Sequence, residues 1–158
     1  MGEGFNLKVS RLIKASPEIV WRAYTHHAIE WFTPRPWTTP EVHYDLHPGG
    51  RADVVMQSPE GERHSYRGVV LEIISVRKLV TTSAMTEGWV PQAGDMNFVR
   101  VDTFTPEGDG TRYTAEARHW DEDAMKAHRG MGFEQGWGMV ADQLAEVAER
   151  LANESPAP

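Results

Sequence analysis

Two side chains that could do chemistry fall, by strand alternation, on faces that otherwise carry apolar residues. Arg11 interrupts the apolar series of 5–13, and His119 closes a later strand-like segment. A charge on such a face has to be paired, exposed or functional, because burying it alone is costly. Either residue could bind a carboxylate or phenolate of a ligand, and His119 could act as a general acid or base. The alternative, which we favour, is a structural ion pair at the end of the sheet, with Glu72 or Asp102 as partner.

A second candidate is the pattern His-Xaa-Asp-Xaa-His formed by His43, Asp45 and His47, which could suggest zinc or iron. These residues alternate with an apolar series, so we expect them on the solvated face. The two histidines would stand about 13 Å apart along an extended strand, too far to share one ion. We therefore predict no metal site. The remaining histidine pairs, at 26–27 and at His128 with Arg129, are interpreted as surface or helix-end residues.

No other catalytic signature is visible in the chain. It has no glycine-rich phosphate loop, no serine nucleophile elbow and no pair of carboxylates expected to be buried together. Because cysteine is absent, thiolate nucleophiles, thiolate metal sites and disulfides are excluded. We expect no cofactor.

Length and charge narrow the class further. The 158 residues are the length of a single domain, and the net charge of −7 argues against nucleic-acid and anionic-membrane partners. No segment resembles a secretion signal or a membrane span, so we expect a cytoplasmic protein, monomeric or homodimeric.

The elements that must position these residues begin with a strand at 5–13. Ser16, Pro17 and Glu18 then supply an N-cap, a first-turn proline and a first-turn acid, which predicts a helix reaching His27. A second short helix is expected at 28–32, followed by a proline-rich loop.

From position 41 onward, alternating apolar residues separated by turn signals predict six more strands. They are expected at 42–46, 52–56, 66–74, 79–85, 96–105 and 111–119. Tight turns between consecutive strands imply antiparallel pairing, and the segment 86–95 is predicted to be a long loop. The clearest hairpin signal is at 106–110.

The C-terminal segment predicts a long amphipathic helix, because apolar residues recur every three or four positions from Phe133 to Leu151. Its first half is rich in glycine, and each glycine disfavours the helix by about 1 kcal/mol relative to alanine. We predict a kink or break at 130–132. Gly132 and Gly136 lie at one edge of the apolar stripe, so the surface of the helix should be hollow there.

Four segments together resemble a known superfamily. They are Ala15-Ser-Pro-Glu-Ile-Val-Trp-Arg-Ala23, the turn at 48–50, the strand at 68–73 with 77–81 after it, and Met131-Gly-Phe-Glu-Gln-Gly-Trp137. Their order and spacing are similar to the SRPBCC (START/Bet v 1-like) superfamily, and most similar to the branch named after the C-terminal domain of the Hsp90 ATPase activator. The resemblance implies a helix-grip fold with an apolar cavity. Members bind lipids, hormones or polyketides, and a few catalyse cyclisation or hydrolysis.

We accordingly expect a single α+β domain over 1–158: a helix-grip fold in which a curved, seven-stranded antiparallel sheet wraps around the long C-terminal helix, with two short helices between strands 1 and 2. The residues expected to line a cavity are mostly aromatic, although they could also form an ordinary filled core. They are Arg11, Trp21, Tyr24, Trp31, Trp37, Met56, Trp89, Phe98, Tyr113, His119, Phe133, Gly136 and Trp137.

The function expected from this arrangement is the binding of a hydrophobic or aromatic small molecule between sheet and helix. One alternative is a cofactor-free enzyme similar to a polyketide cyclase or aromatase, in which Tyr24, Arg11 or His119 transfers a proton. Another is a chaperone-interaction module, although the eukaryotic activator makes much of its chaperone contact through an additional N-terminal domain that has no counterpart in these residues. Enclosed tryptophans without a polar group would favour binding, a paired arginine or histidine beside them would favour catalysis, and exposed tryptophans would favour protein interaction.

Overall fold

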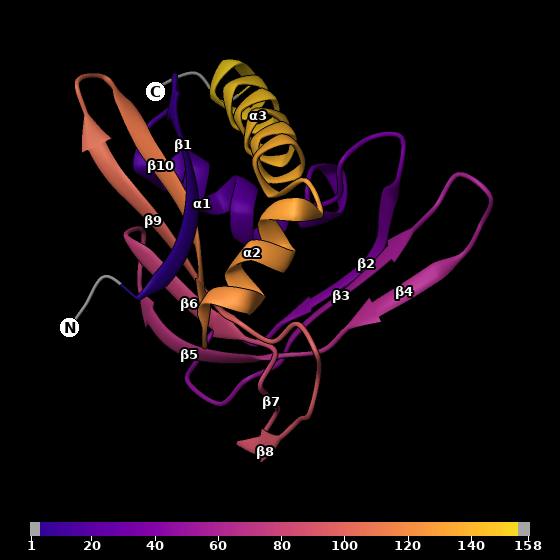
Figure 1. The fold of residues 1–158 in the computed structure, drawn as a ribbon. Helices are drawn as coiled ribbons and strands as arrows, with labels where there is room; N and C mark the ends of the chain where they lie inside the picture. The colour runs from indigo at the N-terminus through magenta and orange to yellow at the C-terminus, as the bar shows by residue number, and fades with distance from the viewer. Residues whose placement is uncertain (1–3, 155–158) are drawn as a thin grey trace.

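The structure, a computed structural model, describes residues 4–154 and forms an α+β fold with antiparallel sheets and a long C-terminal helix (Figure 1). The elements follow one another in this order: β1 (Phe5–Ile13), α1 (Pro17–His26), the 3-10 helix η1 (Ala28–Glu30), β2 (Thr38–Tyr44), β3 (Ala52–Gln57), β4 (Arg63–Tyr66), β5 (Val69–Ile74), β6 (Lys78–Thr82), β7 (Met85–Thr86), β8 (Val90–Pro91), β9 (Val99–Glu107), β10 (Gly110–His119), α2 (Glu122–Gly130) and α3 (Phe133–Glu154).

The strands form two main sheets, which differs from the single seven-stranded sheet that we predicted. One sheet has five strands in the order β1-β10-β9-β6-β5, and the other has three in the order β2-β3-β4. Strands β7 and β8 form a small hairpin inside the segment predicted as a loop. The two sheets touch at a bridge between Arg51 and Val69.

The chain passes from one sheet to the other at Gly68, within the segment 66–74 that was predicted as one strand. Here the chain leaves β4 in one sheet and enters β5 in the other. A Cβ atom on Gly68 would lie 2.5 Å from the carbonyl oxygen of Thr82, so only glycine permits the close approach of these backbones. The carbonyl of Gly68 accepts a hydrogen bond from the amide of Ala52, 3.1 Å away, which ties the crossing to β3.

Local sequence signals account for several boundaries. The Ser16 hydroxyl caps α1 by accepting from the amide of Ile19 at 3.3 Å, as the sequence predicted. The Asp121 carboxylate caps α2 by accepting from the amide of Ala124 at 2.8 Å. The predicted β9–β10 hairpin is confirmed, and its turn contains Gly108 at φ +58°.

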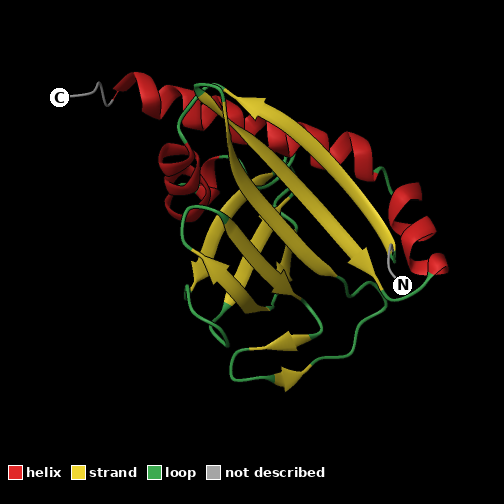
Figure 2. Ribbon diagram, turned by 90° about the vertical axis from the view of Figure 1, so that its left-hand side faces the viewer, coloured by secondary structure: helices red, strands yellow, loops and turns green. Residues whose placement is uncertain are grey.

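The predicted interruption of the last helix is also confirmed. Helix α2 ends at Gly130, α3 begins at Phe133, and Gly132 between them adopts φ +88°, a left-handed conformation that favours glycine. Helix α3 then runs along the five-stranded sheet (Figure 2), where it packs mainly on β1 and α1. No helix in the described part of the chain is long and apolar enough to cross a membrane.

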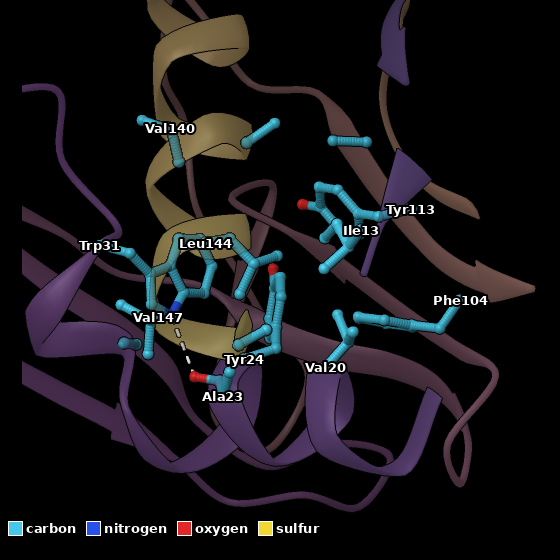
Figure 3. Close-up of a cluster of buried hydrophobic side chains, with 14 of the residues drawn as sticks. Ile13, Val20, Ala23, Tyr24, Trp31, Phe104, Tyr113, Val140, Leu144 and Val147 are labelled. Atoms are coloured by element: carbon cyan, nitrogen blue, oxygen red, sulfur yellow. Dashed lines mark hydrogen bonds between the residues drawn. The ribbon is translucent and has the colours of Figure 1, made fainter. Parts of the chain in front are cut away.

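The buried apolar core lies between α1, the five-stranded sheet and α3 (Figure 3). Tyr24, Phe104 and Leu144 are fully buried there. The indole Nε1 of Trp31 donates to the carbonyl oxygen of Ala23 at 3.0 Å, which satisfies the one polar atom that this ring brings into the core. This end of the fold is therefore filled.

Candidate ligand-binding cavity

A cavity of about 630 Å³ lies at the other end of the fold, between the two sheets and the first half of α3. This volume is in the range of small-molecule sites. Met131, which is 72% exposed, and Tyr66, which is 54% exposed, both line the cavity and so mark its opening to solvent. The wall is formed by Phe32, Pro34, Tyr44, Ala52, Val54, Met56, Tyr66, Arg67, Gly68, Thr81, Thr82, Ser83, Met96, Phe98, Arg100, Tyr113, Ala115, His128, Met131, Gly132, Phe133, Gly136, Trp137 and Val140.

The space exists because the helix carries no bulk where it faces the divergence of the two sheets. A Cβ atom added to Gly136 would meet no atom within 4 Å. Gly132 and Gly136 both lie on the cavity wall, and so does Ala115 of β10, which has a small side chain. In Figure 1 the sheet β2–β3–β4 extends away from α2 and the start of α3.

One wall of the cavity is a cluster of aromatic rings. The ring of Trp137 lies 4.5 Å from Phe133 and 5.8 Å from Phe98 between centroids. His128 packs among the same rings, with its centroid 5.0 Å from Phe98. Such rings offer a large apolar contact area with few rotatable bonds, so they suit the binding of a flat apolar molecule.

The floor of the cavity carries a buried ion pair between Arg100 and Asp102 of β9. The guanidinium Nε donates to Asp102 at 2.9 Å, and Nη2 donates to its second oxygen at 3.3 Å. Asp102 is fully buried and also accepts from the hydroxyls of Tyr24 at 2.8 Å and Tyr113 at 2.7 Å. Each carboxylate oxygen therefore has two donors, and the negative charge is fully satisfied.

The protonation states of this network follow from its burial. Burial raises the pKa of Tyr24 and of Tyr113 well above the usual range, so both hydroxyls remain donors. Burial acts to lower the pKa of Arg100, but Asp102, with the two tyrosines, raises it well above its ordinary value. Arg100 therefore stays cationic, and the two hydroxyls stay neutral.

Arg100 has hydrogen-bonding capacity left over, in contrast to Asp102. Among the described residues, its hydrogen bonds use Nε and Nη2 only, so the N–H groups of Nη1 have no partner. The guanidinium lies over the ring of Trp137, 4.5 Å from the centroid, and 5.1 Å from that of Phe32. This group can donate hydrogen bonds to a carbonyl or carboxylate oxygen inside the cavity.

A pair of histidines lies at the end of the cavity near α2. Nε2 of His119 is 2.9 Å from Nδ1 of His128, and Nδ1 of His119 is 2.8 Å from the carbonyl oxygen of Phe5. Only His128 lies on the cavity wall. Burial, with a smaller contribution from His119, lowers the pKa of His128 to about 4, so this ring is neutral at pH 7.

Six of the thirteen residues that we predicted to line a cavity lie on its wall. They come from β3, the segment before β9, β10 and α3: Met56, Phe98, Tyr113, Phe133, Gly136 and Trp137. The remaining seven lie elsewhere.

Three aromatic residues of the helical insert belong to the filled core instead. Tyr24 is buried beneath the cavity floor, and its hydroxyl bonds Asp102. Trp21 packs edge-on against Phe104 at 5.2 Å, and Trp31 is almost fully buried. Tyr24 and Trp31 lie in one cluster with Leu144 and Val147 of α3 (Figure 3), so the space around them is occupied.

Arg11 and His119 also lie off the cavity wall, although Arg11 does form an ion pair, which is the alternative that we favoured. Arg11 pairs with Asp142 of α3, with Nε 2.7 Å from Oδ1, and not with Glu72 or Asp102. Its side chain is 39% exposed and lies over Gly138, where the missing side chain leaves room for the guanidinium. His119 is buried behind His128, which separates it from the cavity.

The two loop tryptophans lie outside the cavity as well. Trp37 packs against His64 near the β3–β4 hairpin, with 5.6 Å between centroids. Trp89 is 48% exposed and covers Gly49, because the β7–β8 hairpin folds back onto the turn at 48–50.

Arg100 and His128 are among the wall residues that the sequence analysis did not assign to the cavity. Alternation on β9 could have indicated that Arg100 points inward, since it shares a face with Asp102 and Phe104. The opposite face, however, carries Val99 and Val101 and so looked equally apolar. His128 was interpreted as a surface or helix-end residue, and it does lie in the last turn of α2, but it is not on the surface, because it is only 8% exposed. It is near the helix end, but α2 folds against the sheet and turns this ring inward.

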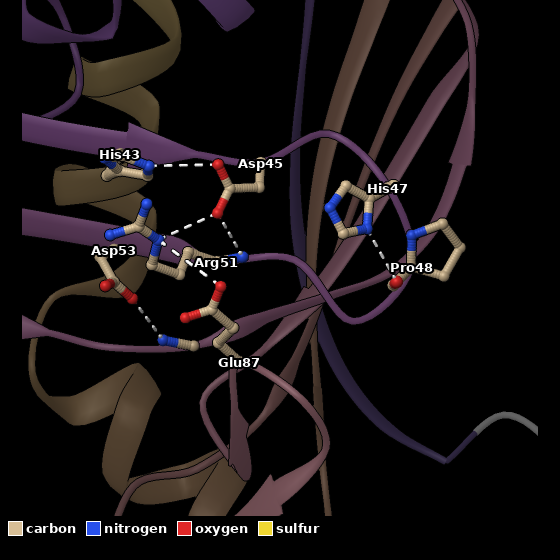
Figure 4. A network of polar contacts seen from close by, with 8 residues as sticks. His43, Asp45, His47, Pro48, Arg51, Asp53 and Glu87 are labelled. Atoms are coloured by element: carbon tan, nitrogen blue, oxygen red, sulfur yellow. Dashed lines mark hydrogen bonds and ion pairs between the residues drawn. The ribbon is translucent and has the colours of Figure 1, made fainter.

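His43 of β2 and His47, which follows that strand, do not lie on the cavity wall. His43 bonds Asp45 at 3.1 Å and His47 contacts the carbonyl oxygen of Pro48, while Asp45 also pairs with Arg51 (Figure 4). Within residues 4–154, no group of three or more histidine, aspartate or glutamate side chains is placed to hold a metal ion.

Comparison with known proteins places this geometry in a family. Residues 14–149 match the model of the activator of Hsp90 ATPase homolog 1-like proteins. A solved structure of a protein from Nitrosomonas europaea is 34% identical, covers 95% of this chain and 97% of its own, and has a TM-score of 0.89. A comparison with curated proteins found no match.

Two more distant structures share the fold. A protein from Rhodobacter sphaeroides is 21% identical, with 95% of this chain and 97% of that chain covered and a TM-score of 0.80. The AHSA1 protein of Silicibacter pomeroyi is 21% identical, with 94% and 99% covered and a TM-score of 0.66. Because the family model covers most of the sequence and the Nitrosomonas europaea protein is similar over nearly its whole length, this chain belongs to the activator of Hsp90 ATPase homolog 1-like family.

Proposed function

We propose that this protein binds a hydrophobic aromatic small molecule in the cavity between its two sheets and α3. The observation that carries the proposal is the cavity itself, about 630 Å³ in volume and walled by Phe98, Phe133 and Trp137. A filled core would contain side chains at this place, whereas the chain here has glycine at 132, just before α3, and at 136, within it.

The polar groups of the cavity support a particular orientation of the ligand. The unpaired N–H groups of Arg100 provide an anchor for an acceptor such as a carboxylate or carbonyl. Because Asp102 balances the charge of Arg100, the cavity does not require an anion, and the apolar contact area supplies most of the affinity.

The test is a fluorescence titration with 2-naphthoic acid, since Trp137 in the wall reports on an aromatic neighbour. We expect saturable quenching in the wild type and its loss in Gly136→Leu, whose side chain would enter the cavity. The matched control is Gly130→Leu. Position 130 is also a helical glycine with open space around it, but it is exposed and lies off the cavity wall.

Two results would contradict the proposal. One is a wild type that neither binds the probe nor retains a ligand detectable by native mass spectrometry after purification. The other is a Gly136→Leu variant that binds as well as the wild type, because the cavity would then not be the binding site.

A second candidate is a cofactor-free enzyme of the cyclase type, and one observation favours it: a paired arginine and a neutral histidine lie on the same enclosed wall. Arg100 could stabilise negative charge that develops on a carbonyl oxygen, and His128 could accept a proton. Incubation with a poly-β-carbonyl thioester and mass spectrometry of the products tests it. Catalysis requires a cyclised product that disappears in Arg100→Met, and an unchanged substrate would refute it.

A protein-interaction role has less support. The two most exposed tryptophans, Trp89 and Trp120, lie off the cavity wall, and the tryptophan on the wall, Trp137, packs against Phe98 and Phe133.

A further inference from the structure

The two buried histidines, His119 and His128, form a series of hydrogen bonds that begins at the carbonyl oxygen of Phe5. The position of each proton in the series follows from this first bond. The carbonyl oxygen of Phe5 can only accept, so Nδ1 of His119, 2.8 Å away, carries the hydrogen. In an uncharged ring Nε2 is then the acceptor. The hydrogen of the 2.9 Å contact therefore belongs to Nδ1 of His128.

This series of hydrogen bonds leaves one of the four ring nitrogens without a partner. Nε2 of His128 carries a lone pair and no hydrogen, and no side chain among residues 4–154 donates to it. In the same part of the chain, every fully buried side-chain nitrogen or oxygen has a partner, so this nitrogen keeps some accessible surface. The ring lies on the cavity wall, within 5.0 to 5.7 Å of Phe98, Phe133 and Trp137 between centroids.

A purely structural role explains only part of this arrangement. The hydrogen bonds at Phe5 and between the rings tie β1, β10 and α2 together, and they use three nitrogens. The fourth would be unnecessary for that purpose, and a phenylalanine would fill the same apolar surroundings without leaving an unpaired acceptor there. The burial that lowers the pKa of His128 to about 4 also keeps this acceptor unprotonated at neutral pH.

We propose that His119 is a positioning residue that fixes His128 in the tautomer with an unprotonated Nε2, and that the bound molecule is a hydroxylated aromatic compound whose hydroxyl donates to this nitrogen. The inference rests on the function proposed above and names the class of ligand. Arg100 and His128 both flank the ring of Trp137. Arg100 offers only donors and His128 only an acceptor, so the complementary ligand carries a carboxylate or carbonyl at one end and a hydroxyl at the other.

The first experiment compares matched ligands by fluorescence titration at pH 8, where neutral imidazole predominates. The probes are 2-naphthoic acid, its 6-hydroxy and 7-hydroxy derivatives, and the methyl ether of each. We expect at least one hydroxy acid to bind about tenfold more tightly than both its ether and the parent acid. His128→Phe should abolish this preference while 2-naphthoic acid still binds.

The second experiment observes the tautomer without any ligand. In a ¹H–¹⁵N correlation spectrum of the histidine rings, His128 should show a protonated Nδ1 and an unprotonated Nε2. His119→Gln should preserve both the tautomer and the hydroxyl preference, because an amide can donate to Phe5 and accept from His128. His119→Phe should lose both.

The outcomes separate the two proposals. A protonated Nε2 on His128, or equal affinity for each hydroxy acid and its ether, overturns the histidine assignment. If 2-naphthoic acid still binds when the histidine assignment fails, the cavity remains a binding site. Persistence of the preference in His128→Phe also overturns the assignment. If none of the five acids binds, the proposed function fails, and the ligand class fails with it.

Discussion

Removal of the Asp102 carboxylate should destabilise the fold severely. Asp102→Ala would leave the Arg100 guanidinium, whose side chain is 14% exposed, without its anion. It would also leave the hydroxyls of Tyr24 and Tyr113 without the acceptor that both now share. Breaking a buried ion pair by removing one partner typically costs about 3–5 kcal/mol, and each orphaned hydroxyl adds about 1–3 kcal/mol.

The cavity admits water to one side of Arg100, which offsets part of this loss, so we expect the free energy of unfolding to fall by about 4 kcal/mol. The total stability of a domain is about 5–15 kcal/mol, so the variant should still fold. With a urea m-value of about 2 kcal/mol per molar, the midpoint should fall by about 2 M. Tryptophan fluorescence during urea titration at pH 7.5 measures this shift.

The matched control is Glu107→Ala. Glu107 pairs with Arg112 on the same β9–β10 hairpin at 2.8 Å, but both side chains are substantially exposed. Such pairs contribute about 0–1 kcal/mol, so the midpoint should shift by less than about 0.5 M. Asp102→Asn, which keeps one acceptor oxygen, should lie between the two. A loss below about 1 kcal/mol for Asp102→Ala would refute the role of the buried network.

Three further predictions concern protonation and backbone conformation. Between pH 7 and pH 4 the wild type should lose up to about 3 kcal/mol more stability than His128→Phe. The reason is that the histidine takes up a proton near pH 6.5 in the unfolded chain, whereas in the folded protein its pKa is lowered to about 4. Equal losses of the two proteins in urea titrations across this range would contradict the pKa shift. Gly68→Ala should lower the unfolding free energy by about 1–3 kcal/mol, because its Cβ would lie 2.5 Å from the carbonyl oxygen of Thr82, and an unchanged thermal midpoint would disprove this close approach. Gly132→Ala should lower the unfolding free energy by about 1–2 kcal/mol, because φ is +88° at this turn, and Gly132→Asn should lower it less. Equal thermal midpoints for these two variants and the wild type would show that the turn is not strained.

The part of the site that the sequence predicted comes from residues whose position follows from a local pattern. Phe133 and Trp137 lie on the apolar stripe of the last helix, and Gly136 at its edge, so their orientation is set by helical periodicity. Met56 and Tyr113 follow from alternation in strands. The pattern could not say which aromatic residues would be enclosed by neighbours, and so Trp21 and Trp31 were wrongly assigned to the cavity rather than the core.

What the sequence by itself determined is the cap of α1 at Ser16, the β9–β10 hairpin, the long last helix and the break before it. Each of these depends on interactions between residues close in the chain, such as a capping hydrogen bond or the left-handed φ of a glycine. Only the tertiary structure decided that the strands divide into two sheets, that Arg11 pairs with Asp142, and that Arg100 and His128 lie on one wall. These outcomes depend on which distant segments pack together, and the same alternation of side chains is compatible with many such packings.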